Sequence, residues 1–130
     1  MESFFGPIVD SYTLEDSLND GFHIDLSKTK AWVDHKFRYP VVTTKNLYNK
    51  YLTTPESLNN RDDQSLDWRV YDTFTMLKFA IQMNHGAQQL QFTVGYAMDP
   101  KTVKDIVVRS VVEPGVNMEP TIILYLPEDD

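Results

Sequence analysis

Residues 67–86, DWRVYDTFTMLKFAIQMNHG, have the pattern of one long helix, and this helix decides the fold. Large apolar side chains recur at the i, i+4, i+7 and i+11 spacing of one helical face, at Val70, Phe74, Leu77 and Ile81. We expect this helix to be mostly buried, because the apolar face is widened by Met76, Ala80 and Met83. Asp67 can cap the first turn, and Gly86 can adopt the left-handed conformation past the last turn.

The residues after this helix alternate like strands. Residues 90–96 place apolar side chains on one face and polar or small ones on the other, and residues 121–126 show a similar alternation. Residues 103–112 are apolar on both sides, as expected of a central strand. Turn residues at 98–101 and at Pro114-Gly115 separate these three segments, so we predict a three-stranded antiparallel meander covered by the long helix.

The residues before the long helix predict short elements. Thr13 and Asp16 resemble a capping box for a helix from Leu14 to about Asn19, and residues 22–26 alternate like a strand. Ser27 can cap a second short helix that runs through Val33 or His35, and Thr44 can cap a third. The fold class is therefore α+β. We expect one domain over residues 1–130, with residues 22–26 as an optional extra strand and residues 53–65 as a mobile polar loop.

Composition predicts an acidic globular protein of the cytoplasm. The chain has 130 residues and no cysteine, and it shows neither a leader pattern nor an apolar run near the ~20 residues of a membrane span. The net charge is −7, with −6 in residues 1–27, +5 in residues 28–50, −1 in residues 51–109 and −5 in residues 110–130. This balance disfavours direct binding to nucleic acid, because phosphate contacts need a basic surface.

The motifs of common enzyme classes are missing from the sequence. No nucleophile elbow, zinc-protease helix, Walker loop or dinucleotide-binding glycine pattern occurs, and the three histidines have no ligand spacing. Asp62, Asp63 and Asp67 are the candidates for a carboxylate metal site, and we interpret them as solvated loop residues. We expect no catalytic residue, cofactor or metal. We interpret the two tryptophans, Trp32 and Trp68, as core and helix-anchoring residues.

Arg69 and Asp72 lie three residues apart on the long helix. One interpretation is an ion pair, or hydrogen bonds from Arg69 to a loop carbonyl, that fixes the helix against the preceding loop. The other interpretation is a polar anchor at a binding surface.

Four segments resemble, in order and spacing, a family of small uncharacterised bacterial, plasmid and phage proteins, a domain of unknown function. These segments are SYTLEDSLNDGFHIDLS, FRYPVVTTKNLY, RVYDTFTMLKFAI and EPTIILYLPEDD. The residues that match its pattern are Asp20-Gly21, Pro40-Val41, Arg69, Asp72 and Leu126-Pro127-Glu128-Asp129. The chain departs at Val116-Asn117-Met118, where the pattern has a more acidic, glycine-rich loop. The resemblance implies a mobile-element context and no catalytic residue.

Two classes of function stay open. We hypothesise a non-enzymatic accessory protein of a phage or plasmid that binds a protein partner and inhibits a host defence protein that targets nucleic acid. If residues 121–126 are an outer strand beside the N-terminal segment, the two acidic ends could form one face that imitates nucleic acid. The partner-binding residues would be Glu15, Asp16, Asp20, Glu128 and Asp129. The alternatives are a small metal-dependent hydrolase or nuclease that uses carboxylates, and a structural or oligomeric accessory protein. No membrane contact is expected, and the oligomeric state is open.

Overall fold

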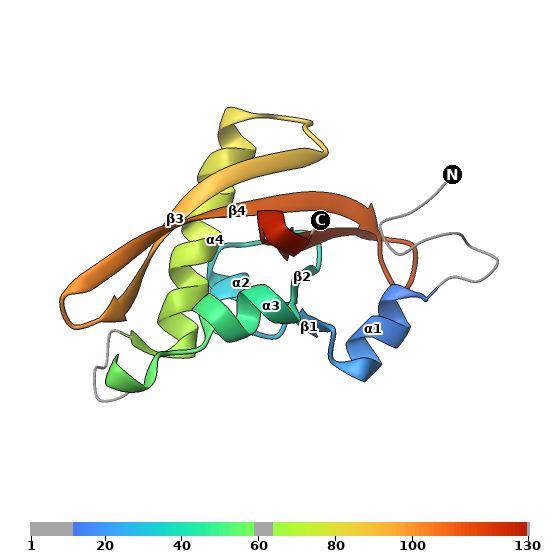
Figure 1. The fold of residues 1–130 in the computed structure, drawn as a ribbon. Coiled ribbons are helices and arrows are strands. Elements are labelled where there is room, and N and C mark those ends of the chain that lie inside the picture. The colour runs from blue at the N-terminus through green and yellow to red at the C-terminus, as the bar shows by residue number, and fades with distance from the viewer. Residues whose placement is uncertain (1–11, 59–63, 130) are drawn as a thin grey trace.

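Short helices and strands alternate in the first half of the chain, and a long helix followed by three strands makes up the second half (Figure 1). The computed structural model describes residues 12–58 and 64–129. The helices are α1 (Leu14–Asp20), α2 (Lys30–Asp34), α3 (Lys45–Leu47) and α4 (Leu66–Met83). The strands are β1 (His23–Asp25), β2 (Val41–Thr44), β3 (Gln89–Asp99), β4 (Thr102–Pro114) and β5 (Pro120–Tyr125). Single turns complete the chain: a π-helical turn η1 (Tyr48–Leu52) and the 3₁₀ turns η2 (Glu56–Leu58) and η4 (Pro127–Asp129).

The strands form one mixed sheet in the order β1-β2-β5-β4-β3. The predicted meander is present, because β3, β4 and β5 pair antiparallel in sequence order. The optional N-terminal strand predicted at residues 22–26 is present as β1, which pairs with β2. Strand β2 was not predicted, and it pairs parallel to β5, so the meander is part of a five-stranded mixed sheet. The idea that residues 121–126 form an outer strand is wrong, because β5 lies third of five. Its apolar side chains on both faces suit this central position.

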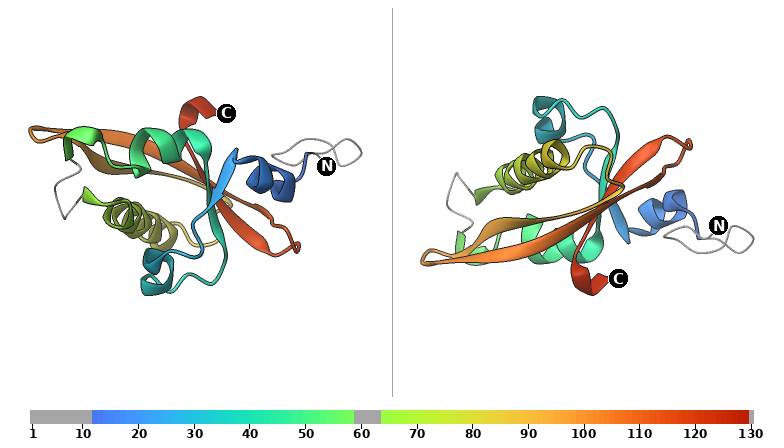
Figure 2. Two further views of the ribbon diagram at one scale, coloured as in Figure 1. Left: turned by 90° about the horizontal axis from the view of Figure 1, so that it is seen from below. Right: turned by 90° about the horizontal axis from the view of Figure 1, so that it is seen from above.

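Helix α4 begins and packs differently from the prediction. Its N-cap is Ser65, whose Oγ accepts a hydrogen bond from the backbone N–H of Trp68. The predicted apolar face is buried at Val70, Phe74 and Leu77. The prediction that Met76 and Met83 belong to that face is wrong, because both are exposed. Among the strands, α4 packs mainly against β3 at the sheet edge, so no strand of the described residues lies beneath its outer flank (Figure 2).

Side-chain caps define where the short N-terminal helices begin. Thr13 and Asp16 form the predicted capping box of α1, and Gly21 ends this helix with φ 81°, where glycine is unstrained. The cap of α2 is Thr29 instead of Ser27, and the hydroxyl of Ser27 bonds the backbone of Val41. Thr44 caps α3 as predicted, and it is also the last residue of β2.

The sheet has an apolar layer on each face. The larger layer lies under α4, α2 and η1 and contains Phe74, Leu77, Val94 and Leu124. The smaller layer lies under α1 on the opposite face and contains Leu14, Val42, Val111, Ile123 and Tyr125. These layers fix α1 and α4 on opposite faces of the same sheet.

Part of the segment 53–65, predicted as a mobile polar loop, forms the turn η2 and is held against the protein. Leu58 in η2 is buried, and the Ser57 hydroxyl donates to the backbone oxygen of Met98 in β3. Residues 59–63 lie outside the described residues. Within the described part of the chain, no helix combines the length and the apolar content that a membrane crossing requires.

Candidate functional site

A groove between α2 and the first turn of α4 is the best candidate for a binding site. It is about 220 Å³ in volume and is lined by Lys30, Ala31, Asp34, Ser65, Asp67, Trp68 and Tyr71. Trp68 stands at its rim with 52% of its surface exposed. Small-molecule sites measure roughly 300–1,000 Å³, so this groove suits one inserted side chain better than a cofactor.

Local caps and a histidine hold the two walls of the groove in place. Thr29 caps α2 by accepting the N–H of Trp32 at 3.2 Å. His35 ends the same helix, and its Nδ1 donates to the carbonyl of Ala31 at 2.8 Å, because a carbonyl can only accept. The other ring nitrogen, Nε2, pairs with the hydroxyl of Thr75 on α4 at 2.9 Å. This histidine therefore ties α2 to α4 directly behind the groove.

Edge-to-face ring contacts hold the aromatic wall of the groove in place. The ring of Tyr71 meets Trp68 edge-on at 5.6 Å between centroids, and it meets His35 at 4.4 Å on its other side. Edge-to-face pairs of this kind contribute about 0.5–1.5 kcal/mol beyond the burial of their area. The two rings are thus held in position before any ligand arrives, which lowers the entropy cost of binding.

The charges around the groove favour a cationic guest. Asp34 and Asp67 are both exposed at the groove and outnumber the ammonium group of Lys30. Aromatic faces attract cations, and an Arg or Lys side chain over a tryptophan gains about 0.5–2 kcal/mol. An apolar stem that ends in a positive group therefore matches the groove in shape and in charge.

Arg69, beside the groove residues in sequence, points into the protein instead. Its Nε donates to the carbonyl of Tyr51 at 2.7 Å, and its Nη1 donates to Gln64 Oε1 and to the carbonyl of Ala97, each at 2.8 Å. Its guanidinium also lies 5.3 Å from the ring centroid of Tyr96. Arg69 donates to backbone carbonyls, as one interpretation expected, but these carbonyls belong to η1 and β3 and not to the loop before α4. Arg69 therefore joins α4 to η1 and β3.

Burial shifts the titration of the groups around this arginine. Desolvation lowers the pKa of Arg69 and raises the pKa of Asp72, because each charge is partly removed from water. Asp72 lies close enough to interact electrostatically with Arg69, and no ion pair joins them in the described residues. Burial also raises the pKa of Tyr96 to about 12, and its hydroxyl bonds Thr73 at 2.6 Å.

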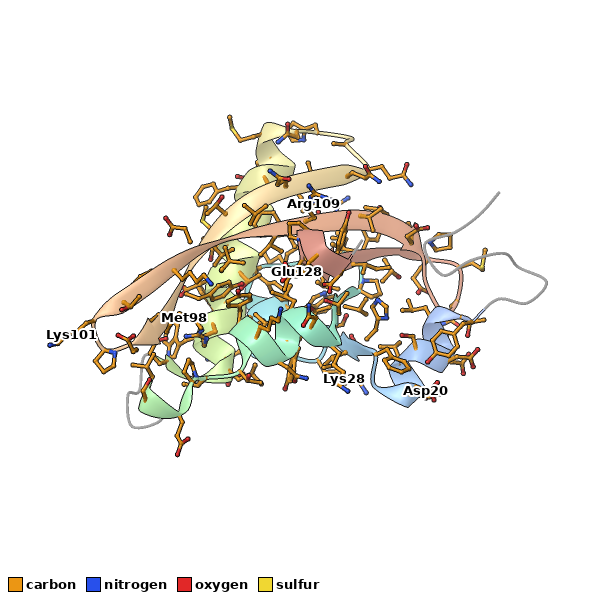
Figure 3. All side chains as sticks on the ribbon, viewed as in Figure 1. Asp20, Lys28, Met98, Lys101, Arg109 and Glu128 are labelled. Atoms are coloured by element: carbon orange, nitrogen blue, oxygen red, sulfur yellow. The ribbon has the colours of Figure 1, made fainter. Side chains whose placement is uncertain are left out.

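The acidic residues predicted for partner binding lie in two groups. Glu15, Asp16 and Asp20 are exposed on α1, where Asp16 belongs to the capping box and Asp20 accepts a hydrogen bond from the Tyr12 hydroxyl. Glu128 belongs to η4, at the other end of the chain (Figure 3). Whether these groups bind a partner stays a prediction.

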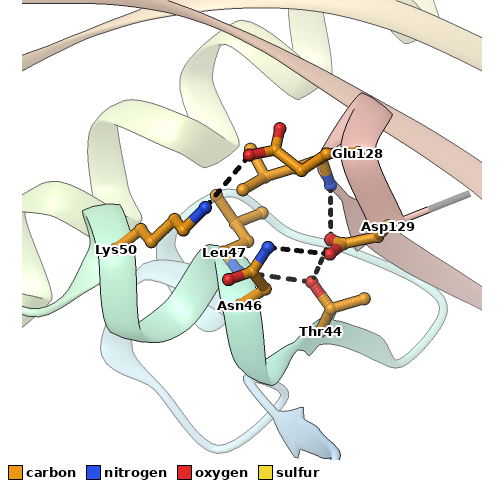
Figure 4. Close-up of polar contacts among 7 residues, drawn as sticks. Thr44, Asn46, Leu47, Lys50, Glu128 and Asp129 are labelled. Atoms are coloured by element: carbon orange, nitrogen blue, oxygen red, sulfur yellow. Dashed lines mark hydrogen bonds and ion pairs between the residues drawn. The ribbon is translucent and has the colours of Figure 1, made fainter.

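The acidic C-terminal turn has a structural role that the sequence does not reveal. The carboxylate of Asp129 accepts hydrogen bonds from Thr44 Oγ1 at 2.8 Å, Asn46 Nδ2 at 2.9 Å and the backbone N–H of Leu126 at 2.8 Å (Figure 4). Its neighbour Glu128 forms only an exposed ion pair with Lys50 at 3.1 Å in the described residues. Asp129 thus fastens η4 to the start of α3.

A hydroxyl–imidazole pair joins α1 to β1. Ser17 Oγ lies 2.5 Å from His23 Nδ1, and both side chains are buried. Burial lowers the pKa of His23, and the charge of Asp129 acts in the opposite direction. A nucleophile must be reached by its substrate, so the burial of Ser17 favours a packing role for this pair.

The residues considered for a metal site are partly outside the described chain. Asp62 and Asp63 lie there, and Asp67 is exposed at the groove. Within residues 12–58 and 64–129, no cluster of three or more His, Asp or Glu side chains is placed to hold a metal ion.

The groove was not predicted, because Trp68 was interpreted as a core and helix-anchoring residue, whereas its ring is half-exposed. The other tryptophan, Trp32, is half-buried and donates its indole N–H to the carbonyl of Tyr39 at 2.9 Å. The position of Trp68 next to the cap Ser65 was a usable signal, because residues of the first helical turn opposite the apolar face point to solvent.

A model described as a family of unknown function, DUF6573, matches residues 1–130, so the chain belongs to this family. No curated protein and no solved structure matches the chain.

Proposed function

We propose that this member of the DUF6573 family is a non-enzymatic protein that acts by binding another protein through the groove between α2 and α4. The half-exposed ring of Trp68 carries the proposal. Tryptophan and tyrosine dominate the binding energy of protein interfaces, and a rigid aromatic pair beside a small groove is typical of such a contact. No enzymatic role is part of the proposal.

The proposed partner inserts a Lys or Arg side chain into the groove. The two carboxylates and the aromatic wall support this choice, and so does the net charge of −7. Proteins that bind nucleic acid present such side chains in their basic grooves. A host defence protein that targets nucleic acid is therefore the partner class we favour, and we propose a phage or plasmid context and the cytoplasm as the compartment.

The exposed carboxylates of α1 support a second part of the proposal. Glu15, Asp16 and Asp20 would attract a basic partner over a distance and raise the rate of association. Glu128 and Asp129 would add to the same field, although Asp129 also has internal hydrogen bonds.

Affinity capture from a natural host tests the groove. Wild-type protein should retain a partner, and Trp68→Ala should lose it. Phe22→Ala is the matched control, because this ring is 56% exposed and lies at the start of β1, away from the groove. Capture that survives Trp68→Ala unchanged, in a protein that melts like the wild type, contradicts the proposal.

Salt dependence tests the charged part. Replacing Asp34 and Asp67 by Asn should slow association and flatten its dependence on salt, because fewer charges attract the partner. Trp68→Ala should mainly speed dissociation instead. If the association rate changes neither with salt concentration nor when Asp34 and Asp67 are replaced by Asn, the partner is not basic.

The alternative of a small metal-dependent hydrolase or nuclease predicts a different result. Mg²⁺, Mn²⁺ or Zn²⁺ would then raise the melting temperature, because an ion that binds only the folded state stabilises it. Our proposal predicts no change in melting temperature with any of these ions.

A further inference from the structure

The outer flank of α4 carries an uncovered apolar surface at its C-terminal half. Met76, Phe79 and Met83 lie on this flank, and Phe79 and Met83 are 57% and 81% exposed. Met83 follows Trp68 by fifteen residues, which is about 22 Å along a helix, so this surface is separate from the groove. Large exposed side chains that gather on one helix face indicate an interaction surface.

Strand β3, beneath this helix, is a sheet edge that pairs with β4 in regular register from Gln89 to Ala97, and a bulge interrupts the pairing between Ala97 and Asp99 at its C-terminal end. It is the last strand in the sheet order, so in the described residues no strand pairs with its side away from β4. It is 11 residues long, and from Gln89 to Met98 it contains neither a charged residue nor a proline. Natural proteins usually protect such edges with charges, prolines, bulges or short strands, because an open edge recruits another strand.

The helix flank and the open edge meet at one place. Arg69 and Thr73 bond Ala97 and Tyr96 of β3, which fixes the side of α4 that faces this strand. Met76 and Met83 follow Arg69 at helical spacing and continue along the same side. A strand added beside β3 would therefore lie next to these methionines.

Among the described residues, hydrogen bonds to this edge are found at its C-terminal end. The carbonyls of Ala97 and Met98 accept hydrogen bonds from Arg69 and Ser57. The open part of the edge is therefore Gln89–Tyr96, which is long enough for a stable strand pair.

We propose that this surface binds a second copy of the chain, with β3 of each copy pairing antiparallel about a twofold axis. The sheets would join into one, and the two α4 flanks would pack together on the same face. Such a contact is self-complementary, because each copy presents the same strand and the same methionines.

Charge and area both favour a second copy. Two copies that each carry −7 repel, so they can meet only through a neutral surface, and β3 supplies one. With the axis at the centre of the open segment, Gln89 of one copy lies beside Tyr96 of the other and Asp99 lies beyond the paired residues, so like charges do not face each other. A stable interface buries about 800 Å² per partner, and the strand edge and the exposed parts of Met76, Phe79 and Met83 contribute to this area from each copy.

Sedimentation of the full chain tests the proposal. Wild-type protein should sediment at twice 15.1 kDa and dissociate on dilution. Met83→Glu should raise the dissociation constant at least about a hundredfold, because the charge enters the interface twice. Met118→Glu is the matched control, since Met118 is 77% exposed in the β4–β5 connection, and it should leave the dimer intact.

A cross-link identifies the paired strand. The chain has no cysteine, so single substitutions at Gln89, Gln91 and Thr93, all exposed on β3, give clean probes. At least one should form a disulfide between copies on oxidation, and Val103→Cys on β4 should form none. A wild-type protein that stays monomeric at all concentrations, or a dimer that tolerates Met83→Glu and forms none of these disulfides, would overturn the proposal.

The proposal of a dimer and the proposal of partner binding at the groove can be refuted independently. Trp68→Ala should leave sedimentation unchanged, and Met83→Glu should leave partner capture unchanged. Salt should strengthen the dimer by screening the repulsion between copies, whereas it should weaken the capture of a basic partner.

Discussion

Removing the carboxylate of Asp129 should destabilise the protein far more than removing that of Glu128, its neighbour. In Asp129→Ala, three donors lose their acceptor: the Thr44 hydroxyl, the Asn46 amide and the N–H of Leu126. Hydrogen bonds to charged groups contribute about 1.5–3 kcal/mol each, and water can replace part of this because Asp129 is half-exposed. We therefore expect a loss of about 3 kcal/mol.

The loss should appear as a large change in melting temperature. An unfolding entropy of about 2.1 cal/mol/K per residue, over 130 residues, converts 1 kcal/mol into about 4 °C. Asp129→Ala should thus lower Tm by about 11 °C in a calorimetric scan. Glu128→Gln removes only the exposed ion pair with Lys50 and should leave Tm unchanged within error. Equal melting temperatures for the two variants would refute the structural role of Asp129.

Three further perturbations test the core, the buried arginine and the buried histidine. Leu77→Asp should abolish cooperative unfolding at room temperature, because an unpaired charge in the core costs about 4 kcal/mol or more, while Gln82→Asp on the exposed side of the same helix should melt near the wild type. Arg69→Met should lower the free energy of unfolding by about 3 kcal/mol in a urea titration, because two backbone carbonyls lose their donor. The stability of Arg69→Lys should lie between those of Arg69→Met and the wild type. Wild-type stability in Arg69→Met would contradict the role assigned to this side chain. Burial lowers the pKa of the His23 imidazole, so as pH falls the unfolded chain binds a proton at this side chain before the folded protein does. The free energy of unfolding should therefore fall as pH drops below the ordinary histidine pKa of 6.5, and His23→Gln should reduce the change in Tm between about pH 7 and pH 5. If His23→Gln and the wild type show the same change in Tm with pH, His23 does not contribute to it.

Helix α4 shows which burial the apolar pattern of a sequence can predict and which it cannot. The buried positions Val70, Phe74 and Leu77 follow from helical spacing alone. The exposure of Met76 and Met83 does not follow from this spacing, because an apolar residue in a helical pattern can belong either to the core or to an interaction surface. Only the position of α4 over the sheet edge separates the two cases.

The sheet order depends on a pairing that leaves no local signal. Strand β2 has the sequence VVTT, and all four residues are buried, so it lacks the alternation that identifies a half-buried strand. It pairs with β5, about eighty residues later, and thereby places β5 in the centre of the sheet. Local patterns therefore predicted the meander and the optional strand at residues 22–26, and they missed β2, which joins that strand to the meander.

The candidate site was less accessible to sequence reasoning than the fold. The groove combines α2 and α4, whose lining residues are more than thirty positions apart, and its charges come from both helices. The acidic ends of the chain were visible in the sequence, but the internal hydrogen bonds of Asp129 were not, because they join residues about 85 positions apart.

Indole resonances of the two tryptophans test the binding groove most directly. Trp68 is half-exposed at the groove, and Trp32 is half-buried with its indole N–H bonded to the carbonyl of Tyr39, so a ¹⁵N-labelled sample contains a probe and an internal reference. Addition of the captured partner should shift or broaden the Trp68 indole signal and leave that of Trp32 unchanged. Binding that leaves the Trp68 signal unchanged would contradict our assignment of the groove as the partner-binding site.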